Sequence, residues 1–102
     1  MDEQALLDTG RALANSHPER LSNLSAAILV TLVLEQCRSS RAFARRFGVA
    51  HALVIRECVE LSSGEDALLR ILSRDERTQR LTYALGDAGI DLMTDIGEKH
   101  PS

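Results

Sequence analysis

Two helical patterns separated by a single short turn constrain this chain more than any other feature. Apolar residues recur at helical spacing on both sides of the turn: Phe43, Ala44 and Phe47 before it, and Leu53, Val54, Cys58 and Leu61 after it. Between them, Gly48 can adopt the left-handed conformation that ends a helix, and Ser39 or Ser40 can cap the first helix. The turn is too short for anything but a tight helix-turn-helix over residues 39–61.

Two further helices are expected before this unit. A helix over 1–16 has its apolar residues near one face, although Gly10 in its interior weakens it by about 1 kcal/mol. Pro18 pushes the residue before it out of helical geometry and, with Glu19, can open the next helix, over 19–37. Residues 24–36 are apolar nearly all round, so this second helix is expected at the centre of the domain.

The pattern changes after residue 65, where apolar and polar residues alternate. Two strands joined by a polar turn at Arg74-Asp75-Glu76-Arg77 are expected over 67–85, followed by a last helix over 87–97. A chain of 102 residues has room for one domain, so all the elements should share one core over 1–102. The expected fold class is mainly α with a small β-hairpin.

Positive charge is concentrated in the middle of the chain. The net charge is −3, yet residues 38–80 hold nine of the twelve basic residues, all of them Arg, against six acidic residues. An anionic partner would therefore meet this segment. The chain has only two Phe and one Tyr and no Trp, which leaves no stacking platform for single-stranded nucleic acid.

Three segments resemble a known family of regulators. The run from Ser39 to Arg56 resembles the Leu-Ala-x-x-Leu-Gly-Val-Ser-x-x-Thr-Val-x-Arg signature of winged helix regulators. Asp75-Glu76-Arg77-Thr78 looks like the Asp-x-Arg at the wing tip of the MarR (multiple antibiotic resistance regulator) family. Residues 83–89 are similar to that family's closing Val-x-Leu-Thr-x-x-Gly. Because the matches occur in the family's order over residues 20–93, the resemblance implies a MarR-like winged helix-turn-helix.

Three residues and the length of the chain depart from the family pattern. Glu57 stands at a usual packing position of the second helix, Ala50 replaces a capping Ser, and Gly86 replaces the Thr that caps the last helix. Family members normally continue into long C-terminal helices that dimerise and shape a ligand pocket. The resemblance therefore implies a short variant and gives no expectation for a small-molecule effector.

The function that the resemblance implies is sequence-specific binding of double-stranded DNA by a transcriptional regulator that needs no cofactor. The second helix would lie in the major groove and place four side chains at the DNA: His51, Ala52, Ile55 and Arg56. Arg41 and Arg45 from the first helix would contact the phosphate backbone. Three arginines from the wing would contact phosphates or an adjacent minor groove: Arg74, Arg77 and Arg80.

A homodimer is expected, because a lone winged domain makes a small footprint and palindromic half-sites are the usual solution. Apolar residues outside the helix-turn-helix and the wing are the candidates for its interface: Leu6, Leu7, Leu13, Ile90, Met93 and Ile96. The alternative is a winged helix that binds another protein and not DNA by itself, which the acidic net charge favours, as do Glu57 and Glu60. The two hypotheses differ in whether these carboxylates are turned away from the arginines.

Other classes of function have little support in the sequence. No nucleophile has a plausible base, so no enzyme activity is expected. Cys37 and Cys58 fit no metal-ligand spacing, and burial as reduced thiols is favoured over a redox role for either. The longest apolar stretch, residues 26–34, is shorter than the roughly 18 residues of a membrane span, and no signal peptide is recognisable, so a cytoplasmic protein is expected.

Overall fold

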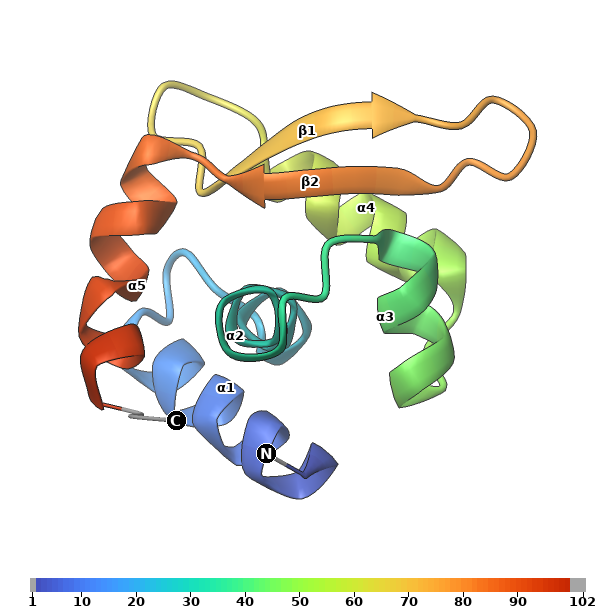
Figure 1. Ribbon diagram of the computed structural model, residues 1–102. Coiled ribbons are helices and arrows are strands. Elements are labelled where there is room, and N and C mark those ends of the chain that lie inside the picture. The colour runs from blue at the N-terminus through green and yellow to red at the C-terminus, as the bar shows by residue number, and fades with distance from the viewer. Residues whose placement is uncertain (1, 100–102) are drawn as a thin grey trace.

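The computed structural model describes residues 2–99, and it describes side chains as far as residue 94. Within these residues the chain forms five helices and a two-stranded antiparallel sheet (Figure 1). In chain order the elements are α1 (Glu3–Ser16), α2 (Asn23–Glu35), α3 (Ser40–Phe47), α4 (His51–Leu61), β1 (Leu69–Arg74), β2 (Leu81–Leu85) and α5 (Asp87–Lys99). The prediction of a mainly helical chain with a small β-hairpin is confirmed.

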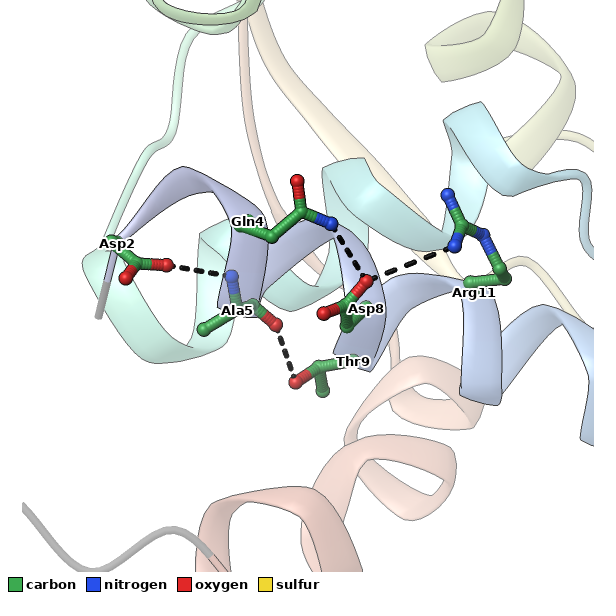
Figure 2. A network of polar contacts seen from close by, with 6 residues as sticks. All are labelled: Asp2, Gln4, Ala5, Asp8, Thr9 and Arg11. Carbon is green, nitrogen blue, oxygen red and sulfur yellow. Dashed lines mark hydrogen bonds and ion pairs between the residues drawn. The ribbon is translucent and has the colours of Figure 1, made fainter.

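The first helix, α1, is capped at its start and packs closely on α2. The Asp2 carboxylate accepts a hydrogen bond from the Ala5 backbone N–H at 2.7 Å, which satisfies one of the free donors of the first turn. Figure 2 shows this contact within a local network that joins Asp2, Gln4, Ala5, Asp8, Thr9 and Arg11. A Cβ at Gly10 would lie 3.2 Å from the Cα of Ala27, so the glycine that weakens α1 also lets the two backbones approach.

The start of α2 differs from the sequence prediction. The chain turns at residues 18–20, and the helix begins at Asn23 and not at residue 19. Ser22 and Ser25 decide the boundary, because each side chain accepts a hydrogen bond from the other's backbone N–H, at 3.0 and 2.8 Å. This capping box satisfies two free donors at once, which a first turn at Pro18 would not do.

The core is built around α2, which Figure 1 shows nearly end-on at the centre of the molecule. Every residue from Ser25 to Leu32 is buried, and α2 contacts α1, α4 and α5. The prediction of a central helix is therefore confirmed. Large buried side chains from the other elements complete the core: Leu6, Phe43, Val54, Leu69, Tyr83 and Met93.

The hairpin is attached to the helices along one strand. In β1 and β2, Leu69 lies opposite Leu85 and Arg74 lies opposite Leu81, with a bulge between Ile71 and Ser73. The other edge of β2 pairs with the chain that leads into α3, through a backbone hydrogen bond of 2.9 Å from Tyr83 to Arg38. The turn of the hairpin is not covered in this way and projects past the helices on the side of α3 and α4 (Figure 1).

The last helix, α5, follows β2 after a single residue and packs closely on the chain before β1. A Cβ at Gly89 would lie 2.1 Å from the carbonyl oxygen of Leu68, so only glycine fits there. The α5 helix contacts both α2 and β2, and Met93 is buried in the core. Over the described part of the chain, no helix combines the length and apolar character needed to cross a membrane.

Candidate nucleic-acid interface

The α3–α4 pair is joined by a turn that glycine makes possible. Gly48 has a φ of 64° and ends α3, and the next backbone N–H, of Val49, donates to the Ala44 carbonyl at 3.1 Å. Ala50 precedes α4 and provides no side-chain cap, whereas Ser39 caps α3 through the Ala42 N–H at 3.2 Å. The backbone N–H groups of the first turn of α4 are thus not occupied by a capping side chain, and a helix N-terminus in this state attracts anions.

A groove lies beside this N-terminus and is lined by two arginines and a histidine. Its volume is about 270 Å³, and Arg41, Arg45 and His51 line it together with Ala44 and Val49. The structure therefore brings together three of the side chains that the sequence assigned to DNA, from two different helices. Two guanidinium groups beside a helix N-terminus suit a phosphate better than any neutral ligand.

His51 has a structural role that the sequence did not reveal. Its Nε2 forms a hydrogen bond of 2.8 Å with Oγ of the buried Ser40, and the same Oγ accepts a bond from Leu81 N–H at 2.9 Å. Ser40 thereby joins α3, α4 and β2. Burial, with a contribution from Arg41, lowers the pKa of His51 below its usual 6.5. The expectation that His51 reads a base edge is therefore corrected for Nε2, which already has a partner in the protein.

The exposed face of α4 carries few polar groups near its N-terminus. Among residues 51–57, Ala52, Leu53 and Arg56 are exposed, whereas Ile55 is half-buried and packs against the core. Ala52 and Arg56 are thus exposed on α4, and their contact with DNA stays a prediction. Ile55 is only partly available, because it contributes to the core as well as to the surface.

The carboxylates of α4 are turned toward a different part of the molecule. Glu57 and Glu60 line a hollow of about 390 Å³ against residues 18–25, away from the groove lined by the arginines. Burial, together with the neighbouring Glu60, raises the pKa of Glu57 above its usual 4.5. The sequence left open where these acids point, and the structure separates them from Arg41 and Arg45.

Arg74 at the end of β1 is held in place by Gln79. Its Nε and Nη2 groups both donate to Gln79 Oε1, at 2.9 and 2.6 Å, and Gln79 Nε2 donates to the Glu76 carbonyl at 2.9 Å. Because the two ends of the Gln79 amide have different partners, the orientation of the guanidinium is fixed. Two of the five N–H groups of Arg74 are used in this way, and the rest remain for a ligand.

The turn that follows is ordered by Asp75. Its carboxylate accepts hydrogen bonds from the backbone N–H groups of Arg77 and Thr78, at 2.9 and 3.0 Å, and these bonds lower the pKa of Asp75. The side chains of Arg77 and Arg80 are exposed on this turn. The hairpin therefore presents three arginines, Arg74 included, on a turn with defined backbone geometry.

Two other arginines contact the protein itself. Arg46 donates to Glu35 at 3.2 Å and lies 5.5 Å from the centre of the Phe47 ring, and this hydrogen bond lowers the pKa of Glu35. Arg20 donates to the Asp66 carbonyl at 2.7 Å. These contacts distinguish Arg46 from Arg41 and Arg45, its neighbours on α3, which line the groove.

The predicted dimer interface requires a correction. Leu6, Leu13 and Met93 are buried in the core of the chain itself, so a second copy has no access to them. Leu7 and Ile90 remain exposed, at 37% and 51%. The side chain of Ile96 lies outside the described residues. An apolar helix face is normally covered by other side chains. For Leu6, Leu13 and Met93, three of the six predicted interface residues, the chain's own core around α2 provides this cover.

Neither cysteine is placed for reaction. Cys58 is buried, which raises the pKa of its thiol to about 12, and burial also raises the pKa of the half-buried Cys37. A thiol reacts as its thiolate, so both environments disfavour oxidation. In the range for which side chains are described, no three His, Cys, Asp or Glu residues come together as a candidate metal site.

Comparisons with known proteins add no relative. No protein-family model, curated protein or solved structure matches this chain significantly. What the groove, α4 and the hairpin bind must therefore be inferred from their own geometry and from the resemblance described above.

Proposed function

We propose that this chain is a MarR-like winged helix-turn-helix protein that binds double-stranded DNA and regulates transcription. In this proposal α3, the turn and α4 form the helix-turn-helix, and β1 and β2 form the wing. The order of the elements supports it, since five helices and one hairpin follow each other as the resemblance requires. The α4 helix would enter the major groove with its N-terminal half against the bases.

The observation that carries the proposal is the separation of charge around α4. Arg41 and Arg45 line the groove at its N-terminus. The hairpin turn projects on the side of α3 and α4 (Figure 1), and its arginines are exposed. The carboxylates of Glu57 and Glu60 face the hollow beside residues 18–25. A net charge of −3 is therefore compatible with a polyanionic partner, because Glu57 and Glu60 line a hollow apart from the groove of Arg41 and Arg45.

Binding of labelled duplex DNA, followed by fluorescence anisotropy, tests the proposal. Two double variants remove arginines from the two proposed backbone contacts, Arg41→Ala with Arg45→Ala, and Arg74→Ala with Arg77→Ala. Each should weaken binding and reduce the slope of log K against log salt by about 1.8 per bound chain, at about 0.9 per lost phosphate contact. Arg11→Ala is the matched control, because Arg11 is an exposed arginine on α1 that pairs with Asp8. Equal effects of all three changes would contradict the proposal.

One observation favours a second candidate, a winged helix that binds another protein. Leu53 and Val59 are exposed on α4, at 48% and 41%, and exposed apolar residues on one helix suit a protein partner. The same titration separates the two candidates. If no duplex binds even at low salt, DNA binding by the free chain is ruled out and the protein partner becomes the better proposal.

The proposed regulator would act as a homodimer, since two copies could bind the two halves of a palindromic site. Leu7 and Ile90 are the predicted interface residues that remain exposed. Sedimentation equilibrium of the protein, alone and with a duplex, measures the stoichiometry. Two chains per duplex are expected.

A further inference from the structure

We infer that α4 recognises its DNA site mainly through the methyl groups of thymine, an inference that rests on the proposed function. The surface concerned is the face formed by Ala52, Leu53, Arg56 and Val59. Three of these four side chains are apolar, so this face can do little hydrogen bonding to base edges.

The four residues form one continuous surface on the helix. Residues three and four apart are neighbours on a helix, so Arg56 lies beside Ala52, Leu53 and Val59. All four are exposed, Leu53 at 48% and Val59 at 41%. The core side of α4 is formed instead by Val54, Cys58 and Leu61, which are buried.

Two other polar side chains of α4, those of His51 and Glu57, are engaged elsewhere or turned aside. The Nε2 atom of His51 is bonded to Ser40 Oγ at 2.8 Å. Glu57 lines the hollow against residues 18–25. Glu60 also lines it, but is exposed beside Arg56 and carries only hydrogen-bond acceptors. Within residues 51–57, Arg56 is thus the only exposed side chain that can donate a hydrogen bond to a base.

The chemistry of the major groove determines what such a face can distinguish. Thymine presents a C5-methyl group there, and apolar side chains contact it, whereas the other bases are identified by hydrogen bonds. Arginines on the neighbouring elements, in the groove at α3 and on the hairpin, would match the phosphates that flank the bases. This charge pattern favours DNA over an apolar peptide as the occupant.

Replacement of thymine by deoxyuridine tests the inference, because uracil has the same hydrogen-bonding groups and lacks only the methyl. The full chain is first used to select its preferred duplex from a random pool. Each thymine of the selected site is then replaced in turn, and affinity is measured by fluorescence anisotropy. At contacted positions affinity should fall about fourfold per methyl, as expected for one buried carbon group.

Protein variants assign the effect to α4. In Leu53→Ala or Val59→Ala, the loss caused by uracil at one or more positions should shrink. Both side chains are exposed, so these variants are expected to fold. Leu72→Ala is the matched control, because Leu72 is similarly exposed, at 54%, but belongs to β1 and has no assigned contact with a base or with a second copy. It should retain the full uracil effect.

The outcomes separate this inference from the proposed function. Binding to a selected duplex that uracil does not weaken at any position overturns the inference and leaves DNA binding intact. A selected site without thymine does the same. Failure to bind any duplex overturns both, and then Leu53 and Val59 mark a surface for a protein.

Discussion

Tyr83 combines complete burial with an unsatisfied hydroxyl. Among the described residues, its Oη is the one buried side-chain oxygen or nitrogen without a hydrogen-bond partner, and burial raises its pKa. A buried hydroxyl that makes no hydrogen bond costs about 1–3 kcal/mol. Tyr83→Phe should therefore leave the free energy of unfolding in urea unchanged or raise it by about 1 kcal/mol. A loss of stability would show that the hydroxyl has a partner in solution.

Glu57 should make the free energy of unfolding depend on pH. Its pKa is raised in the folded state by burial and by Glu60, so the folded protein binds a proton more tightly than the unfolded chain does. Stability contributed by this group is therefore lost as pH rises through the region just above 4.5. Glu57→Gln should stabilise the protein at neutral pH, and the gain should vanish below pH 4.5.

Urea unfolding of both proteins at several pH values measures this gain. Glu65→Gln serves as the control, because Glu65 is an exposed residue between α4 and β1. A gain that is independent of pH would mean that the carboxylate of Glu57 is not the cause.

At the scale of elements, the contact between α5 and the chain before β1 depends on glycine. In Gly89→Ala the new Cβ would lie 2.1 Å from the Leu68 carbonyl oxygen, and backbone must move to admit it. Asp91→Ala is the control, because Asp91 is exposed on the same helix and gains similar helix propensity. Gly89→Ala should cost about 1–3 kcal/mol or more in thermal unfolding. A stability equal to that of the control would contradict the packing described for α5.

The hairpin turn positions an arginine, and Gln79→Gly tests this role. Gln79 has a φ of 62°, which glycine adopts without strain, so the variant should keep the turn and lose the side chain that holds Arg74. Affinity for duplex DNA should fall about two- to tenfold, since ordering one long side chain costs about 0.5–1.5 kcal/mol. In an Arg74→Ala background the same change should have no further effect. An equal loss in both backgrounds would show that Gln79 acts independently of Arg74.

The local elements were the predictable part of this fold. Gly48 and the spacing of Phe43 and Phe47 specify the end of α3, and the change from helical to alternating pattern reveals the hairpin. The start of α2 was misplaced, because Pro18 is compatible with a first turn while the Ser22–Ser25 capping box is a stronger signal. That signal was present in the sequence and could have been used.

At the scale of the whole molecule, contacts between distant segments could not be predicted. Ser40 meets His51 and Leu81 across three elements, and no local pattern in the sequence marks that meeting. An apolar pattern indicates that a residue is buried, but it does not show whether its own chain or a second copy buries it. Leu6 and Met93 are therefore predicted at a dimer interface, although the core of the single chain buries them. The exposure of the hairpin arginines was easier to predict, because charge in a polar turn needs no distant partner, and their contact with DNA stays a prediction.

The proposal that the chain binds double-stranded DNA also concerns the whole molecule, because the groove, α4 and the hairpin would have to contact one duplex. The direct measurement is the affinity of the unmodified protein for a duplex as a function of salt. If Arg41, Arg45, Arg74, Arg77 and Arg80 contact phosphates, log K should fall against log salt with a slope of about −4.5 per bound chain. A slope near zero, or no binding at low salt, would contradict the account.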